Sequence, residues 1–170
     1  MGGTFAPQRT LLSICGHKNA PHMTTEIRTA ISIILNRETV AALPTELASL
    51  AAAIEKSKYL LRLEKDFDGE GSEAYSQEVW LKAVRFVAEY ARWLFDVFGK
   101  IMVTPKIYHG PEGSIDIYWE NQQFNLLINI PTGDTPATFY GDNYGEQVTE
   151  GRFDPENFQQ ALLPHLSIIS

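Results

Sequence analysis

Cysteine is almost absent from this 170-residue chain, in which Cys15 is the single example. One cysteine cannot form an intramolecular disulfide, and a cysteine-rich zinc site is excluded as well. The sequence also lacks any run of about 18 consecutive apolar residues, the length that a membrane-spanning helix needs. These two absences favour a globular protein in a reducing compartment, and we expect a cytoplasmic protein that does not contact membranes.

Basic residues are scarce in the last part of the chain. Residues 101–170 contain only Lys106 and Arg152 against nine acidic residues, so this part carries a charge of −7, equal to that of the whole chain. Nucleic-acid binding requires positive charge to neutralise phosphates, which makes a nucleic-acid partner unlikely from the sequence. A basic protein partner is electrostatically more favourable.

Motifs of the common enzyme classes are missing too. The chain has no G-x-S-x-G nucleophile turn, no phosphate-binding G-x-x-x-x-G-K-[ST] loop and no dinucleotide fingerprint. Cys15, His17 and His22 lie close together in sequence but lack a fourth metal ligand. We therefore predict no cofactor, no metal site and no catalytic residues. Paired carboxylates are available, Asp116 with Glu120 and Asp66 with Asp68, and Asp142 is a further one. They keep one alternative open, a small carboxylate- or metal-dependent hydrolase that uses Asp68, Asp116 or Asp142.

An acidic loop at residues 66–71 invites comparison with a calcium-binding loop. Glu64, Asp66 and Asp68 fit the first, third and fifth ligand positions, and Gly69 fits the sixth. The twelfth position, however, is Tyr75, where a bidentate glutamate is required. A solvated turn with glycines at positive φ is the more frequent structure of such a segment, and we predict that turn.

The clearest structural pattern is the stretch Gly113–Ile130, in which apolar residues alternate with polar ones. A period of two is typical of β-strands, because successive side chains point to opposite faces. A tight turn at Asn121-Gln122 would bring the apolar residues of both strands onto one face, while glutamine at the second turn position suits a longer loop better. The pairs predicted for the tight turn are Trp119 with Phe124, Ile117 with Leu126, and Ile115 with Ile128.

Helical spacing precedes this hairpin. We predict a first helix from Thr24, with an apolar stripe of Ile27, Ala30, Ile31, Ile34 and Leu35, and a second helix from Pro44 to about Lys65. A third, long amphipathic helix is predicted between an N-cap at Ser76 and Gly99, because Ser favours the N-cap and Gly the position after the last turn.

Further strands and a last helix are predicted on either side of the hairpin. A strand before it covers 104–109, strands after it cover 137–140 and 146–153 with a bulge at Gly151, and Asp154-Pro155 begins a closing helix over 154–167. The fold class is α+β: N-terminal helices and one long amphipathic helix packed on an antiparallel β-meander of four to five strands, closed by a C-terminal helix. Residues 1–23 are expected to be a poorly ordered tail, and residues 24–170 a single domain, with a helical part at 24–100 and the meander at 104–153.

Two groups of residues resemble a known protein type. They are Asp68-Gly69-x-Gly71 and Pro111-x-Gly113-Ser114-Ile115-x-x-x-Trp119, followed by Phe139-Tyr140-Gly141-Asp142. This pattern over residues 66–153 is similar to widespread, small, uncharacterised prokaryotic proteins with a D-G-x-G turn and a P-D-G-S-I-x-x-x-W strand. Phe67 and Glu112 stand where those proteins usually have Trp and Asp. The resemblance implies a fold and a setting among mobile or defence-type genes, and it supplies no catalytic residue.

The leading functional hypothesis is a non-enzymatic protein-interaction module, of an antitoxin- or immunity-like kind. Its candidate binding residues are those that the hairpin would turn outward, together with a tyrosine of the next strand: Asp116, Tyr118, Glu120, Asn125, Leu127, Asn129 and Tyr140. Tyrosine and leucine at a surface are suited to anchor a protein contact. A plain solvent-facing sheet, or a face covered by an N-terminal helix, is the alternative. The expected partner is another protein of basic charge, and homo-oligomer formation is a further option.

Overall fold

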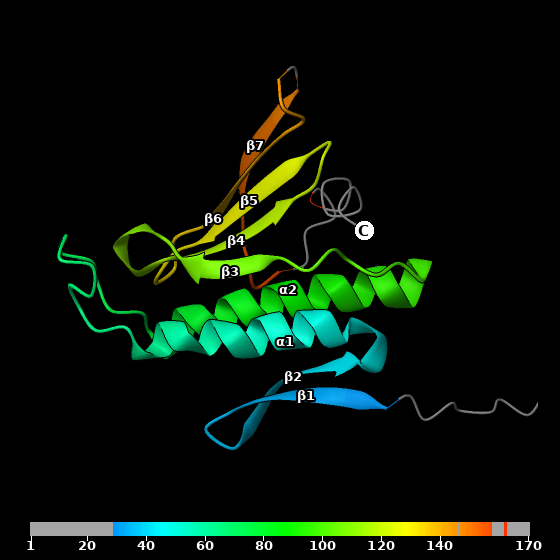
Figure 1. Ribbon diagram of the computed structural model, residues 1–170, viewed down its shortest axis with the longest axis horizontal. Coiled ribbons are helices and arrows are strands. Elements are labelled where there is room, and N and C mark those ends of the chain that lie inside the picture. The colour runs from blue at the N-terminus through cyan, green and yellow to red at the C-terminus, as the bar shows by residue number, and fades with distance from the viewer. Residues whose placement is uncertain (1–28, 146, 158–161, 163–170) are drawn as a thin grey trace, which may run out of the picture.

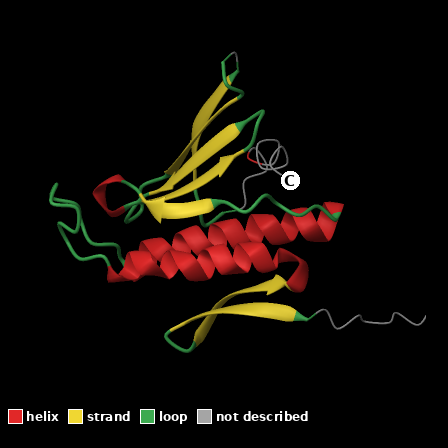
Figure 2. Ribbon diagram, viewed as in Figure 1, coloured by secondary structure: helices red, strands yellow, loops and turns green. Residues whose placement is uncertain are grey.

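Two helices lie between two antiparallel sheets of different size. The computed structural model describes residues 29–145, 147–157 and 162. A five-stranded sheet packs on one side of the helices α1 (Ala48–Ser57) and α2 (Gln77–Phe98), and a two-stranded hairpin packs on the other side (Figures 1 and 2). The α+β class with antiparallel sheet is confirmed. The predicted tail at 1–23 lies outside the described residues.

The first predicted helix is wrong, because its described part forms a β-hairpin. Strand β1 (Ala30–Leu35) pairs with β2 (Glu38–Pro44) through a two-residue turn, in which Asn36 and Arg37 have φ of 50° and 72°. Positive φ at both positions matches the turn type whose twist suits a hairpin. Ile33 is completely buried while Ile34 is 48% exposed, so the apolar side follows a period of two rather than the predicted helical stripe.

The second predicted helix is confirmed in its central part and is shorter than expected. Residues Thr45–Leu47 and Lys58–Arg62 form 3₁₀ turns on either side of α1, and Pro44 ends β2 instead of beginning the helix. Lys58 ties the hairpin to this helix, because its Nζ donates to the carbonyl oxygen of Ile34 at 2.6 Å.

Helix α2 is confirmed with both of its predicted ends. The Ser76 hydroxyl accepts a hydrogen bond from the Val79 backbone N–H at 3.2 Å, which satisfies one of the free donors of the first turn. Gly99 ends the helix with φ of 65°, a conformation that costs other residues energy. Ten residues of α2, including Trp80, Phe86 and Tyr90, are buried.

The five-stranded sheet is a meander in chain order. Its strands are β3 (Lys106–His109), β4 (Ile115–Glu120), β5 (Asn125–Ile130), β6 (Ala137–Asp142) and β7 (Val148–Phe153). The predicted tight turn is wrong and the longer loop is right, because Trp119 pairs with Leu126 and Ile117 with Ile128. A shift of two residues leaves each side chain on its predicted face, since the period of a strand is two.

The bulge predicted at Gly151 is absent from the pairing of β6 with β7. The register continues without a break from Ala137–Phe153 to Asp142–Val148. Gly151 lies opposite Phe139, and a Cβ at this position would come within 2.6 Å of the phenylalanine ring. Glycine is therefore required for the space that it leaves to a large neighbour rather than for an extra residue.

The core lies between the helices and one face of the meander. Ile115, Ile117, Trp119, Leu126 and Ile128 are at most 1% exposed on that face. Described residues 154–157 form a turn rather than the first turn of the predicted helix, and the remainder of that helix, apart from Leu162, lies outside the described residues. Within the described part of the chain, neither helix is long and apolar enough to span a membrane.

Candidate functional site

The strand register places all seven predicted surface residues on the face of the meander that points away from the helices. We call this the outer face. Its side chains form three rows across the strands, each made of residues that are direct partners in neighbouring strands. The tyrosine row is Lys106, Tyr118, Leu127, Tyr140 and Glu150; the asparagine row is Tyr108, Asp116, Asn129, Thr138 and Arg152; the third row is Glu120, Asn125, Asp142 and Val148.

The tyrosine row provides apolar area at the surface. Tyr140 is 41% exposed, and Tyr118 and Leu127 are partly buried by their neighbours. Lys106 interacts with two neighbours on this face. Its Nζ lies 3.5 Å from a carboxylate oxygen of Glu120 and 5.6 Å from the centre of the Tyr118 ring. Burial, followed by the charge of Glu120, raises the pKa of Tyr118, so its phenol is neutral at physiological pH.

The asparagine row contains a hydrogen-bonded polar group. The Nδ2 of Asn129 donates to Asp116 Oδ1 and to Ser114 Oγ, each at 2.7 Å. This group lies directly against Gly110, where a Cβ would come within 2.5 Å of the Ser114 hydroxyl and 2.9 Å of the Asp116 carboxylate. Burial raises the pKa of Asp116 despite the opposing effects of the Asn129 hydrogen bond and the charge of His109.

The third row is less available for binding than we predicted. Asn125 donates from Nδ2 to Asp142 Oδ1 at 3.0 Å, and the same oxygen accepts from the Tyr144 backbone N–H at 2.8 Å. These bonds fix the turn that follows β6. Asn125 therefore has a structural partner, which the sequence pattern could not indicate.

The acidic loop at residues 66–71 and the segment that follows β3 meet at one end of the asparagine row. The Tyr75 hydroxyl donates to the Gly110 carbonyl at 2.9 Å, and the Phe67 ring lies 5.5 Å from the ring of His109. Between the acidic loop and the end of β3 is an open depression of about 610 Å³. We call it the acidic depression, because Asp68, Glu70, Glu73, Glu112 and Asp116 line it together with Tyr75 and His109.

The aspartates of the acidic loop accept hydrogen bonds from the loop itself, as expected for a turn. Asp66 Oδ1 accepts from the Gly71 N–H at 2.7 Å, and Asp68 accepts from the Glu70 N–H and the Ser72 hydroxyl. These hydrogen bonds, the Ser72 hydroxyl first, lower the pKa of Asp68. Gly69 and Gly71 have φ of 76° and 83°. In the described part of the chain, no three His, Cys, Asp or Glu side chains converge in a way that could hold a metal ion.

The carboxylates of the hydrolase alternative are only partly brought together. Asp68 and Asp116 line the same depression, beside His109. Asp142 lies in the third row, on β6, and does not line it. The sequence points to Asp68 and Asp116 as candidate carboxylates, but it could not indicate that they line one depression, because the two residues are 48 positions apart.

A second hollow lies on the outer face itself. We call it the crossing groove, because its lining residues come from β5, β6 and β7 in turn, so that it runs across the strands. Leu127, Tyr140 and Glu150 line it from the tyrosine row, and Asn129, Thr138 and Arg152 from the asparagine row; its volume is about 440 Å³. Thr138, Glu150 and Arg152 were missing from our prediction, which considered mainly the central hairpin.

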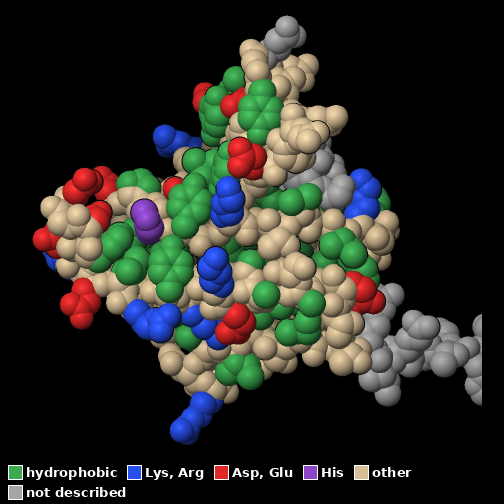
Figure 3. Space-filling model, viewed as in Figure 1, with side chains coloured by type: hydrophobic (Ala, Val, Ile, Leu, Met, Phe, Trp, Pro, Cys, Tyr) green, Lys and Arg blue, Asp and Glu red, His purple; other side chains and the backbone are tan. Residues whose placement is uncertain are grey.

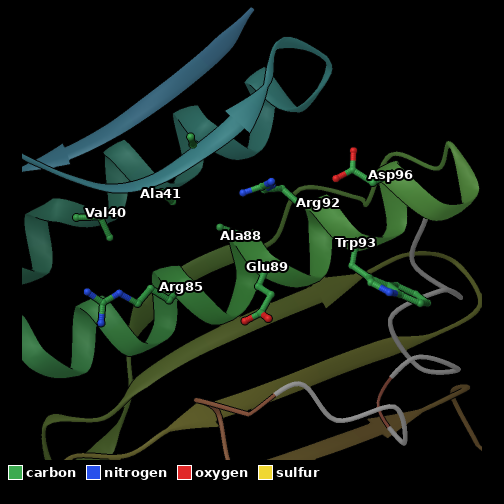
Figure 4. A pocket seen from close by; sticks show the side chains of 9 residues that line it. Val40, Ala41, Arg85, Ala88, Glu89, Arg92, Trp93 and Asp96 are labelled. Carbon is green, nitrogen blue, oxygen red and sulfur yellow. The ribbon is translucent and has the colours of Figure 1, made fainter. Parts of the chain in front are cut away.

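Figure 3 shows hydrophobic side chains running up the sheet and acidic side chains gathered over the loop between α1 and α2. A further groove of about 530 Å³ separates β2 from α2 (Figure 4). Its charged lining alternates along the helix as Arg85, Glu89, Arg92 and Asp96. Because the two signs balance, this groove indicates no charge preference for a ligand.

The comparisons with known proteins add no assignment to this geometry. No family model, no curated protein and no solved structure matches the chain.

Proposed function

We propose that this chain is a non-enzymatic protein-interaction module that binds a partner protein through the outer face of its meander. The observation that carries the proposal is the tyrosine row, in which Tyr118, Leu127 and Tyr140 lie side by side on neighbouring strands. Tyrosine is enriched among the residues that contribute most to protein binding, because its ring is large and rigid and its hydroxyl is polar.

The charge of the outer face supports a basic partner. Glu120, Asp142 and Glu150 accompany the tyrosines, and the acidic depression adjoins Asp116. Of the two basic residues in these rows, Lys106 is already paired with Glu120. An antitoxin- or immunity-like role, in which the chain covers a basic surface of another protein, agrees with this distribution of charge.

Site-specific crosslinking tests the proposal. A photo-reactive amino acid is introduced at Thr138, the residue of the asparagine row on β6 that lines the crossing groove, and a second variant carries it at Val97, which is 56% exposed on α2. We expect a crosslinked protein from native lysate at Thr138 and not at Val97. The crosslink should disappear in the double substitution Tyr118→Ala/Tyr140→Ala and persist in Phe98→Ala, an exposed aromatic on α2.

Identical crosslinks at both positions, or a crosslink that survives loss of both tyrosines, would refute binding through the outer face. Far-UV circular dichroism and urea denaturation of each variant separate lost binding from lost folding. Tyr118→Phe and Tyr140→Phe keep the rings and should retain the crosslink.

A second candidate is the small carboxylate-dependent hydrolase, favoured by Asp68 and Asp116 in one depression with their pKa values displaced in opposite directions. Such a displacement is what an acid–base pair of carboxylates needs. Hydrolysis of p-nitrophenyl acetate, phosphate and glycosides tests it. Turnover that is lost in Asp68→Asn and Asp116→Asn but kept in Asp142→Asn supports the enzyme; turnover at the buffer rate removes it.

A further inference from the structure

The crossing groove of the outer face lies next to the acidic depression. The crossing groove passes over β7, β6 and β5, where Asn129 forms part of its lining. Asn129 is hydrogen-bonded at 2.7 Å to Asp116, and Asp116 lines the acidic depression. The two hollows are therefore neighbours, with this hydrogen-bonded residue pair between them.

The tyrosine row has a spacing that suits one extended conformation of a peptide. Tyr118 on β4 and Tyr140 on β6 are separated by one strand, on which Leu127 lies. Because neighbouring strands are about 4.8 Å apart, the two tyrosine positions are roughly 9.6 Å apart. A polyproline II helix advances about 3.1 Å per residue, hence about 9.3 Å over three residues. Every third side chain of such a peptide would meet one tyrosine of the row.

Proline-rich segments gain from this arrangement in two ways. Aromatic side chains that line a groove pack against proline rings, and the polyproline II conformation is already present in the free peptide, which reduces the entropy lost on binding. A β-strand added at an edge would instead use backbone groups of β3 or β7 and would not contact the middle of the outer face. The contacts offered here are side chains in mid-sheet.

The charges define the direction of the bound segment. Five acidic side chains line the depression at the Asp116 end, whereas Glu150 and Arg152 at the β7 end carry opposite charges. A basic residue of the ligand is thus most favourable at the end that reaches Asp116.

Resting on the proposed function, we propose that the ligand of the outer face is an extended, proline-containing segment of a partner protein that lies across β4 to β7 and places a basic side chain in the acidic depression. Its prolines contact Tyr118 and Tyr140, and Leu127 lies between these contacts.

Fluorescence anisotropy with three labelled peptides of roughly ten residues tests this, a length of about 31 Å as polyproline II. The first has proline at every third position and arginine at one end, the second has glutamate in place of arginine, and the third has glycine and serine in place of proline. We expect saturable binding of the first, and at least tenfold weaker binding of the other two. Tyr118→Ala/Tyr140→Ala should weaken the first at least tenfold, and Phe98→Ala should not.

Equal binding of the proline and glycine–serine peptides would overturn the inference, because charge alone would then explain the affinity. So would the absence of binding by all three peptides. If the tyrosine-dependent crosslink to a partner persists in that case, the proposed function stands and only the class of ligand is wrong. If the crosslink is absent as well, both proposals fall.

Discussion

Gly151 shows how one missing side chain fixes the packing of the meander. It lies opposite Phe139, whose ring also approaches Phe153 at 6.3 Å between centres. In Gly151→Ala the new Cβ would overlap the ring at 2.6 and 2.8 Å, so Phe139 must move against its neighbours. We expect a loss of about 1 kcal/mol in the free energy of unfolding, measured by urea denaturation. This is the lower end of the cost of overpacking, because Phe139 and Gly151 are only partly buried and line the crossing groove.

The double variant Gly151→Ala/Phe139→Leu controls this prediction. A smaller side chain at position 139 removes the overlap, so the effects of the two substitutions should not add. If Gly151→Ala alone is as stable as the parent chain, the Phe139 ring is not confined by β7 and our account of this glycine is wrong.

The raised pKa of Asp116 makes the free energy of unfolding depend on pH. Burial raises its pKa in the folded state above the unfolded value. The folded chain then binds the proton more tightly, so stability falls as pH rises from the unfolded pKa through the folded one, and the penalty remains at higher pH. Asp116→Asn keeps an oxygen that can accept from Asn129 and removes the charge. We expect it to melt at a higher temperature than the parent at pH 7, with little difference near pH 4.

Gly151→Ala is a matched control for this experiment, because it changes no titratable group. The difference between its melting temperature and that of the parent should stay constant over the same pH range. A difference between Asp116→Asn and the parent that shrinks with rising pH would show that the carboxylate is stabilised in its charged form.

At the scale of the element, the cap of α2 is the feature most open to measurement. Ser76→Ala removes the acceptor of the Val79 N–H, and we expect a loss of about 1 kcal/mol, within a range of about 0.5–2 kcal/mol. Because α2 supplies ten buried residues, the loss should appear in global urea denaturation. Ser76→Asp restores an acceptor and adds a charge that the helix N-terminus favours. An aspartate variant as unstable as the alanine variant would contradict the cap.

Elements whose signals are local could be predicted from the sequence, and those that depend on distant partners could not. Ser76 and Gly99 define α2 by themselves, since a cap and a C-terminal glycine act within one turn. The segment from Ala30 to Leu35 fits both a helical and a strand period, because Ile31, Ile33 and Leu35 alternate while Ile31, Ile34 and Leu35 form a stripe. Its isoleucine content and the Asn36 turn were the signals that favour a strand.

At the scale of the whole molecule, the outer face could be predicted but its hollows could not. Alternation in β4 and β5 assigns each side chain to a face whichever turn joins the strands, so the seven predicted residues share one surface. The acidic depression requires the loop at 66–71 to meet the end of β3, a contact made by Phe67 with His109 and by Tyr75 with Gly110. No periodicity in the sequence indicates this contact between the loop and the end of β3.

The charge of the whole molecule also affects the rate at which a ligand would associate. The last 70 residues carry a charge of −7. Of their acidic side chains, Glu120, Asp142 and Glu150 lie on the outer face, while Glu112 and Asp116 line the depression together with acidic residues of the loop at 66–71. A field of one sign accelerates the approach of a basic ligand, and salt screens it over a length of about 30 Å at 0.01 M and about 8 Å at 0.15 M. In the proposed complex, the tyrosine contacts form only after the peptide has reached the outer face.

We therefore expect salt and tyrosine substitution to act on different rate constants of the arginine–proline peptide. Raising the salt from 0.01 to 0.15 M should lower the association rate on the order of tenfold and change the dissociation rate little. Tyr118→Ala/Tyr140→Ala should raise the dissociation rate and leave the salt dependence of association intact, because it removes no charge. Stopped-flow anisotropy measures both rates. An association rate that ignores salt would mean that the acidic depression does not guide the peptide, even if the tyrosines hold it.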